Sequence, residues 1–235
     1  MTSGPQWQYD ESRHAGVDYS DDAVVLDYDN RHTRFRDYEK EATRIIDALG
    51  LTKDSIVVDM GCGSGGLSVH FAKHCGKVHA VDVSPKMVEL CGRKAGEQNL
   101  KNIETVCAGF LTYEHKGEPP DAIVSTAVLH HLPDFWKQVA LRRMYEMLKP
   151  GGKLFLFDIV FNFPVDEYQN SIDGWLESIE KMGGKAMKDE SVIHVKEEFS
   201  TWGWIMERMI EIAGFRIDIN NSIQPNMQVY ICSKT

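Results

Sequence analysis

The amino-acid sequence predicts an α/β fold in which helices cover both faces of a mostly parallel sheet. Short apolar runs alternate with helical patterns from Ile56 to about Val160. These runs are mainly apolar, which is typical of strands buried on both faces. The chain has 235 residues, of which 43% are hydrophobic, and this is enough for one such domain with an insertion.

The expected elements follow one another in a regular order. A first helix is predicted from Arg36 to Leu49, because apolar residues recur at helical spacing and Gly50 follows as a stop signal. Another helix opens at Ser84, whose hydroxyl suits an N-cap, with Pro85 at the first helical position. The predicted strands are "IVVDM", "KVHAVDV", "IETVCA", "DAIVST" and "KLFLFDIV", and further helices are predicted at "LSVHFAKHC" and after Asp134.

This rhythm stops after Val160. Residues 161–200 mix aromatic residues, glycines and charges, and we interpret them as a lid-like insertion over a ligand pocket. A helix is predicted over about 201–213, and the strand-like runs "FRIDIN" and "MQVYICS" follow with a short connection, which predicts an antiparallel hairpin. We therefore divide the chain into an N-terminal segment, residues 1–35, and one domain, residues 36–235.

The turn after the first strand, "VVDMGCGSGGLS", fits two templates. Gly61, Gly63 and Gly66 satisfy the dinucleotide pattern G-x-G-x-x-G, whereas Gly61, Gly63 and Gly65 satisfy G-x-G-x-G with Asp59 two residues upstream. A carboxylate at this position would repel a pyrophosphate, so Asp59 favours a ligand that carries positive charge. Asp82 ends the second strand 21 positions after Gly61, where a carboxylate can accept both hydroxyls of a ribose. The pattern therefore indicates a nucleoside that also bears a cation.

S-adenosylmethionine matches this description. The segments "VVDMGCGSGG", "VHAVDVSPKMVE", "DAIVSTAVLHHLPD" and "MLKPGGKLFLFD" resemble the successive motifs of class I S-adenosylmethionine-dependent methyltransferases. The similarity is greatest to the small-molecule branch that includes the ubiquinone and sugar O-methylating enzymes. The resemblance implies a Rossmann-like sheet of seven strands with an antiparallel last strand, and an enzyme that releases S-adenosylhomocysteine.

The resemblance also implies roles for individual residues. The methionine part of the cofactor would lie among Asp59, Gly61, Cys62, Gly63 and Gly65, near Thr126 and Ala127. Asp82 would hold the ribose, with Val83 and Met87 against the adenine. Many relatives have an acid after the third strand that meets the adenine amino group, but this sequence has "AGF" there, so backbone groups of Gly109 and Phe110 would substitute. Tyr28, in "LDYDNRHTRF", would close over the cofactor as part of the N-terminal segment.

Candidate catalytic residues follow the fourth and fifth strands, at the sheet edge where α/β proteins bind ligands. In some small-molecule O-methyltransferases a histidine and an acid at such positions act together near the acceptor hydroxyl. His130 or His131 would take the proton and Asp158 would orient the imidazole. The alternative is structural: "LHHLPD" shapes the turn into the next helix, and Asp158 supports the loop.

The composition of the chain limits the kinds of partner and ligand that we expect. The formal net charge of −9 argues against wrapping a nucleic acid. The five cysteines form no C-x-x-C pair, so we expect free thiols in a cytoplasmic protein. No apolar run approaches membrane-spanning length. We expect a monomer or homodimer that acts on a small molecule. We expect no metal site, because His70, His74 and His79 are not arranged as ligands and His194 is alone.

Several other functions stay open at this point. The chain could modify or cleave S-adenosylmethionine itself, which a lid too tight for any acceptor would favour. It could also be a non-catalytic cofactor-binding partner, which an exposed apolar face without an acceptor pocket would favour. An NAD-dependent oxidoreductase is disfavoured by Asp59, and RNA methylation by the charge and by the lack of an N-P-P-Y-like motif.

Overall fold

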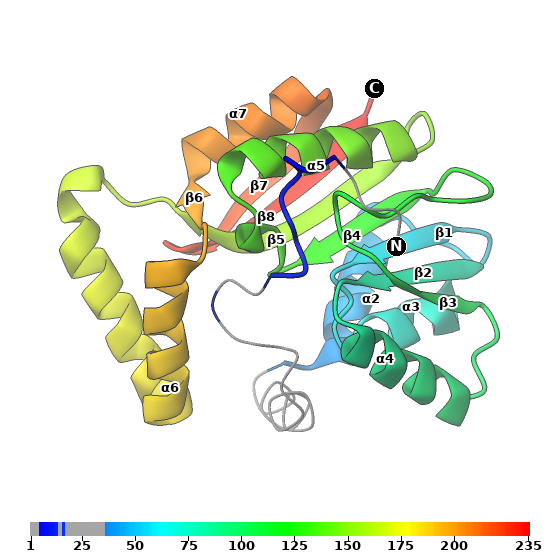
Figure 1. Cartoon of the computed structure of the whole chain (residues 1–235), viewed down its shortest axis with the longest axis horizontal. Helices are drawn as coiled ribbons and strands as arrows, with labels where there is room; N and C mark the ends of the chain where they lie inside the picture. The colour runs from blue at the N-terminus through cyan, green and yellow to red at the C-terminus, as the bar shows by residue number, and fades with distance from the viewer. Residues whose placement is uncertain (1–4, 14–15, 17–35) are drawn as a thin grey trace.

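The structure is a computed structural model that describes residues 5–13, 16 and 36–235 (Figure 1). In chain order the elements are α2 (Tyr38–Leu49), β1 (Ile56–Met60), α3 (Ser68–His74), β2 (Lys77–Asp82), α4 (Pro85–Glu97), β3 (Ile103–Cys107), β4 (Ala122–Thr126), η1 (Leu129–His131), α5 (Asp134–Met147), β5 (Lys153–Phe161), η2 (Val165–Glu167), α6 (Tyr168–Glu197), β6 (Thr201–Trp202), α7 (Gly203–Ala213), β7 (Phe215–Gln224) and β8 (Met227–Lys234). The predicted cap of α4 is present, because the Ser84 hydroxyl accepts a hydrogen bond from the backbone N–H of Met87 and Pro85 opens the helix.

The strands of the described part form one sheet in the order β3-β2-β1-β4-β5-β8-β7, and β6 adds a two-residue strand beside the end of β5. Strands β1 to β5 are parallel. Strand β8 runs antiparallel to both β5 and β7, so the final hairpin inserts its last strand between its first strand and the rest of the sheet. The predicted fold class is confirmed, and β6 is an addition that the sequence did not indicate.

Helices cover both faces of the sheet. Figure 1 shows α5 and α7 on one face and α2, α3 and α4 on the other. The fully buried side chains of β1 alternate accordingly: Val58 packs in the core under α5 and α7, whereas Val57 packs in the core under α2 and α3. Because β1 lies between β2 and β4, the strand order reverses between β1 and β4, and the crevice beyond their carboxyl ends is the expected ligand position.

The region where the rhythm of the sequence stops is largely helical. Helix α6 is interrupted at Gly184, whose φ of 78° and ψ of −177° are not helical, so it consists of two arms. Figure 1 shows these arms standing beside the sheet and not upon it. Within the described residues, no helix has the length and apolarity that crossing a membrane requires.

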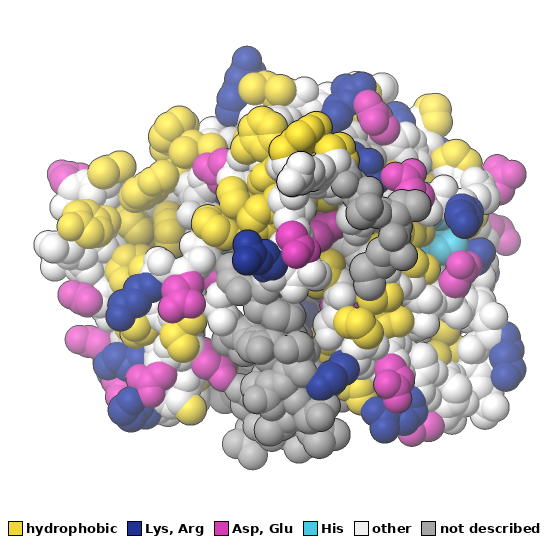
Figure 2. Space-filling model, viewed as in Figure 1, with side chains coloured by type: hydrophobic (Ala, Val, Ile, Leu, Met, Phe, Trp, Pro, Cys, Tyr) yellow, Lys and Arg dark blue, Asp and Glu magenta, His cyan; other side chains and the backbone are white. Residues whose placement is uncertain are grey.

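The described N-terminal residues lie against the domain. The ring of Trp7 stacks on Trp136 of α5 with centroids 6.3 Å apart. In Figure 2 hydrophobic side chains gather over α5 and α7, whereas Lys and Arg side chains are interspersed with Asp and Glu on the face shown. This face therefore carries mixed charge and no continuous basic field.

Candidate active site

The glycine turn after β1 folds back over the end of β2. The backbone N–H groups of Gly61 and Cys62 both donate to the carbonyl of Val81, at 2.8 and 2.9 Å. Gly61 has a φ of 77°, and a Cβ on it would lie 2.4 Å from Cγ1 of Val128. Only glycine fits this conformation and this contact without displacement. The turn therefore brings bare backbone to the crevice between β1 and β4.

Asp82 and its predicted neighbours line a small cavity beside this turn. The Asp82 carboxylate accepts hydrogen bonds from the N–H of Gly63 at 2.8 Å and of Ser84 at 2.9 Å. The cavity has a volume of about 110 Å³ and is bordered by Gly61, Gly63, Asp82, Val83, Met87, Gly109, Phe110 and Ala127, among others. Most residues that the resemblance assigns to the nucleoside are thus brought together.

Asp59 is a buried acid beside the glycine turn. Its side chain belongs to β1, only 2% of the residue is exposed, and the hydroxyl of Ser68 donates to its carboxylate at 2.5 Å. Burial raises the pKa of Asp59 to about 6, although the Ser68 hydrogen bond acts in the opposite direction. A buried carboxylate with this pKa is costly to ionise, and a cationic ligand group would offset that cost, as the sequence analysis expects of the ligand.

A second, larger cavity meets the first. It has a volume of about 940 Å³ and is bordered by Asp59, Cys62 and Thr126 on the side of the turn. Gly61, Ala127, Val128 and His131 border both cavities. Gly65 borders neither: its φ of 83° and its closeness to Cys91, where a Cβ would lie 2.5 Å from the thiol sulfur, make it part of the turn's architecture.

Away from the turn, the larger cavity is mainly apolar. It is lined by Phe157 and Ile159 of β5, by Met227 and Val229 of β8, and by Trp175, Ile179 and Met187 of α6. Of the aromatic residues expected in the insertion, Phe161 and Phe163 instead pack near Trp202, with ring centroids 6.1 and 5.2 Å from it. Met182 is 57% exposed.

An acid reaches the small cavity from the N-terminal segment. Both carboxylate oxygens of Glu11 accept from the N–H of Leu111, at 3.0 and 3.1 Å, and one accepts from the hydroxyl of Thr112. The carboxyl group lies so close to Gly109 that a Cβ there would be 2.4 Å away. The acid missing from "AGF" is therefore present in space, from a position about 100 residues upstream. Tyr28 lies outside the described residues.

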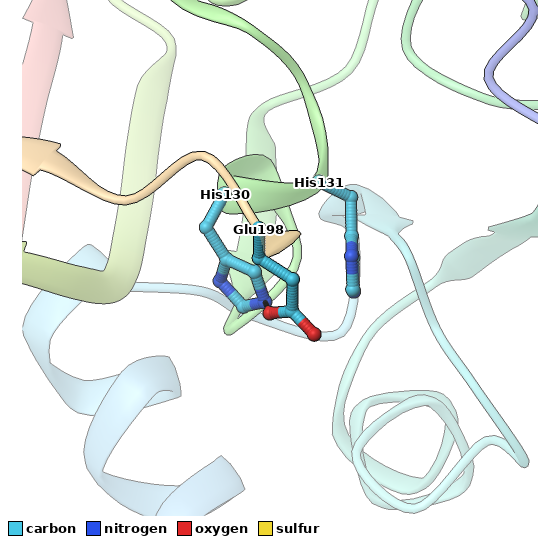
Figure 3. A group of neighbouring side chains, drawn as sticks. All are labelled: His130, His131 and Glu198. Atoms are coloured by element: carbon cyan, nitrogen blue, oxygen red, sulfur yellow. Dashed lines mark ion pairs between the residues drawn. The ribbon is translucent and has the colours of Figure 1, made fainter. Parts of the chain in front are cut away.

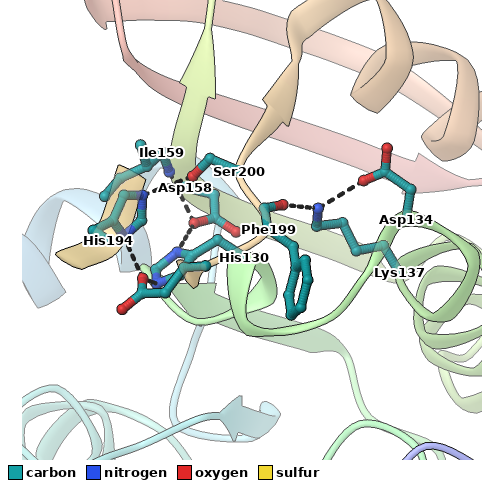
Figure 4. A network of polar contacts seen from close by, with 9 residues as sticks. His130, Asp134, Lys137, Asp158, Ile159, His194, Phe199 and Ser200 are labelled. Carbon is teal, nitrogen blue, oxygen red and sulfur yellow. Dashed lines mark hydrogen bonds and ion pairs between the residues drawn. The ribbon is translucent and has the colours of Figure 1, made fainter. Parts of the chain in front are cut away.

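A network of histidines and acids lies where β4 and β5 end (Figure 4). His130 in η1 is buried, and its Nδ1 lies 2.5 Å from Oδ1 of Asp158 in β5. Its Nε2 lies 3.2 Å from Oε2 of Glu198, which directly follows α6. The same Glu198 oxygen contacts Nδ1 of His194, and Nε2 of His194 lies 2.8 Å from the hydroxyl of Ser200.

Burial and the neighbouring charges shift the pKa values of these side chains in different directions. Burial opposes a charge on His130, but Asp158 and then Glu198 outweigh it and raise the pKa of His130 to about 9. Burial, reinforced by the adjacent His130, lowers the pKa of His131 to about 4. Burial opposes ionisation of Glu198, yet its contacts with His130 and His194 hold its pKa below the ordinary value.

Hydrogen bonds from the neighbouring elements fix the segment that carries Glu198. The backbone N–H of Phe199 donates to the carbonyl of His130 at 2.8 Å. Lys137 of α5 has a fully buried side chain whose ammonium donates to the Phe199 carbonyl and, at 2.7 Å, to Asp134. Figure 4 shows this line of contacts from Asp134 to Phe199.

The structure therefore alters the expectation for the histidines. His130, His131 and Asp158 are brought together as predicted, although Asp158 is fully buried and can act on a ligand only through His130. His194 is not alone, and the expectation that it would be was wrong. Sequence reasoning missed Glu198, even though His194 and Glu198 have the i, i+4 spacing that places side chains on one face of a helix.

Comparisons with known proteins give methyltransferases as the relatives of this chain. Residues 57–152 match the methyltransferase domain family. A ubiquinone biosynthesis O-methyltransferase of Coxiella burnetii is 35% identical over 111 residues, which are 47% of this chain and 46% of that protein. An uncharacterised methyltransferase of Geobacillus kaustophilus is 30% identical over 142 residues, covering 60% of this chain and 62% of the relative. This chain thus spans about half to three fifths of the curated relatives it matches.

Solved structures show the same fold. A S-adenosylmethionine-dependent methyltransferase from Clostridium acetobutylicum superposes with a TM-score of 0.67 at 13% identity, over 90% of this chain and 97% of the other. One from Aquifex aeolicus gives a TM-score of 0.65 at 18% identity, over 92% and 99% of the two chains.

Proposed function

We propose that this chain, a class I S-adenosylmethionine-dependent methyltransferase by its family match and fold, methylates an oxygen atom of a small-molecule acceptor. The observation that carries this proposal is the junction of the two cavities. Gly61, Ala127, Val128 and His131 border both the small cavity beside Asp82 and the large apolar cavity. A cofactor held on one side and an acceptor held on the other would meet at this junction.

The residues beside the turn fit the cofactor. S-adenosylmethionine supplies a methyl group activated by a positively charged sulfur. Asp82, which lines the small cavity, is placed to accept the ribose hydroxyls. Asp59, which lines the large cavity beside the turn, is placed to face the cationic amino-acid end. The protein's main contribution to such a displacement is alignment of the two reactants.

The histidines are placed to handle the proton of an acceptor hydroxyl group. His131 borders both cavities, so it lies nearest the position where the acceptor oxygen would approach the methyl group. His130 borders the large cavity, and Asp158 fixes the orientation of its ring through Nδ1. We therefore assign His130 and His131 to the acceptor oxygen and Asp158 to positioning.

The acceptor cavity favours an organic molecule with an apolar body. Among the described residues, the indole N–H of Trp175 is buried without a hydrogen-bond partner, and Trp175 lines this cavity. A polar group of the acceptor would satisfy this donor, since a buried donor without a partner costs about 1–3 kcal/mol. A cavity of about 940 Å³ weighs against an enzyme that acts only on its own cofactor, and against a non-catalytic partner without an acceptor pocket.

We also propose a cytoplasmic location and a monomeric or homodimeric assembly. The five cysteines are all unpaired, which fits a reducing cytoplasm. The mixed charge of the face in Figure 2 gives no support to a nucleic-acid partner.

The test measures formation of S-adenosylhomocysteine with a panel of acceptors. Each acceptor carries a hydroxyl group, a thiol, an amine or a nucleophilic carbon atom on an apolar scaffold. We expect turnover with hydroxyl acceptors. His131→Ala should lower kcat about 10²-fold or more, a larger effect than its change in cofactor affinity. His74→Ala, at the exposed end of α3, is the matched control. Turnover confined to thiol, amine or carbon acceptors, or full activity of His131→Ala, would contradict the oxygen assignment.

A further inference from the structure

We propose that His130, His131 and Glu198 bind a divalent transition-metal ion, with Zn²⁺ as the best match, at the end of the acceptor cavity. The donor atoms of these three side chains all lie within 4.8 Å of one another. Figure 3 shows the Glu198 carboxylate between the two imidazole rings. The proposal rests on the proposed function for the role of the ion but not for its binding. It replaces the expectation of no metal site, which was formed without Glu198.

The spacing of the donors suits a tetrahedral ion. Two donors that each lie about 2.1 Å from a tetrahedral metal are about 3.4 Å apart. Nε2 of His130 and Oε2 of Glu198 lie 3.2 Å apart, so this pair already has the required separation. The other donor separations are at most 4.8 Å, so the third donor, on His131, would have to approach by no more than roughly 1.5 Å, a movement that a change of its χ1 and χ2 angles would supply.

The surroundings orient the proposed ligands as metal sites require. A ligating histidine usually donates its other ring N–H to a carboxylate, which fixes the tautomer. Nδ1 of His130 meets the buried Asp158 in this way at 2.5 Å, leaving Nε2 directed at Glu198. Glu198 is in turn contacted by Nδ1 of His194, whose Nε2 can accept from the Ser200 hydroxyl at 2.8 Å. Each of the two ligands therefore has an outer partner.

The backbone around Glu198 is also held in place. Glu198 follows the last turn of α6, and its N–H donates to the His194 carbonyl at 3.0 Å. The next residue, Phe199, is fixed by His130 on one side and by the buried Lys137 on the other. A preformed donor set loses less conformational entropy on binding than a flexible one.

The ligand types and the open side define the chemistry. Two imidazoles and one carboxylate suit Zn²⁺ and other late first-row ions better than Mg²⁺ or Ca²⁺, which prefer oxygen donors. Three protein ligands leave a fourth position for a bound molecule, the pattern of catalytic zinc sites. All three side chains line the acceptor cavity, so that position faces the acceptor. An ion there would act as a Lewis acid on the acceptor's hydroxyl group, and His130 and His131 would then act on that group through the ion instead of taking its proton directly.

The experiment measures metal binding directly, on the full chain stripped of metal with a chelator. Zn²⁺ affinity is determined by competition with a chromophoric chelator, and Co²⁺ is added to record its visible absorption, which reports coordination geometry. We expect one ion per chain and a low-coordinate Co²⁺ spectrum. Glu198→Gln should abolish this binding, and Asp158→Asn should weaken it about 10–100-fold. Glu197→Gln, at the exposed neighbouring position, should bind as the original protein does.

The outcomes separate this proposal from the proposed function. S-adenosylhomocysteine binding serves as the check that each variant is folded. The metal proposal is wrong if the stripped protein binds the cofactor product but takes up no Zn²⁺ at 100-fold molar excess, or if Glu198→Gln binds Zn²⁺ unchanged. Methyl transfer by the metal-free protein together with either result would leave the proposed function standing. Specific Zn²⁺ binding without methyl transfer to any acceptor would uphold the metal site and refute the function.

Discussion

Asp59 is expected to carry a cost in stability that cofactor binding offsets. Its burial raises its pKa from the ordinary 3.8 to about 6. At about 1.36 kcal/mol for each pH unit, this difference corresponds to about 3 kcal/mol for holding the ionised side chain in the ligand-free fold. Asp59→Asn removes the charge and keeps an oxygen that can accept from Ser68. The substitution should therefore stabilise the free protein by at most about 3 kcal/mol at neutral pH.

The sign of the pH dependence follows from the direction of the shift. Because the pKa of Asp59 is higher in the folded state, the folded protein binds more protons than the unfolded chain between pH 3.8 and about 6. The contribution of Asp59 to stability falls as the pH rises through this window, and the full cost is present above it. The advantage of the Asn variant should thus be small at pH 4 and largest above pH 7.

The assay is urea denaturation of both proteins at pH 5, 6 and 7.5, with and without S-adenosylhomocysteine, and with the exposed Asp54→Asn as a matched control. The variant should gain stability without ligand, equivalent to a rise of up to roughly 6–12 °C in Tm, and should bind the ligand more weakly. In the original protein, affinity should be about tenfold lower at pH 5 than at pH 7 because the ligand then requires ionised Asp59. A ligand-free Asn variant less stable than the original at pH 7.5, or an affinity independent of pH, would refute this reasoning.

Three further substitutions test the site. Gly61→Ala should abolish binding of S-adenosylhomocysteine in calorimetry, because its Cβ would lie 2.4 Å from Val128. Gly96→Ala, with open space around it, is the control, and normal binding by Gly61→Ala would contradict the role assigned to Gly61. Asp82→Asn should weaken that binding at least tenfold, since charged hydrogen bonds contribute about 1.5–3 kcal/mol; an unchanged dissociation constant would remove Asp82 from the site. Trp175→Phe, which removes the unpartnered N–H together with part of the indole ring, should raise the KM of the acceptor about fivefold with kcat unchanged, and an unaltered KM would show that this donor does not meet the acceptor.

The sequence predicted those parts of the fold that local patterns encode. The five parallel strands are short and mainly apolar. The caps at Ser84 and Gly50 have side-chain and backbone requirements that a few residues satisfy. The residues assigned to the nucleoside converge because the carboxyl ends of neighbouring parallel strands meet at one edge. The antiparallel hairpin also followed from the short connection between its strands, whereas the strand order was not predicted.

The features of the site that the sequence did not predict depend on contacts between segments that are far apart in the chain. Glu11 reaches Leu111 across 100 positions, and no pattern within the first 20 residues indicates this. His194 and Glu198 meet His130 only because α6 folds back at Gly184 and its second arm returns to the end of β4. The insertion gave a mixed sequence signal because its helices pack little against the sheet, so their hydrophobic spacing is weak.

The bend at Gly184 gives the insertion a second consequence. The arm before the bend carries Trp175 and Ile179 on the wall of the large cavity, and the arm after it carries His194 and leads to Glu198. A bulky acceptor that displaced the first arm would also displace the second, because the two arms are joined at Gly184. We therefore expect the fit of an acceptor against the cavity wall to be coupled to the position of His194 and Glu198, so that a poorly fitting acceptor would disturb the histidine–glutamate cluster.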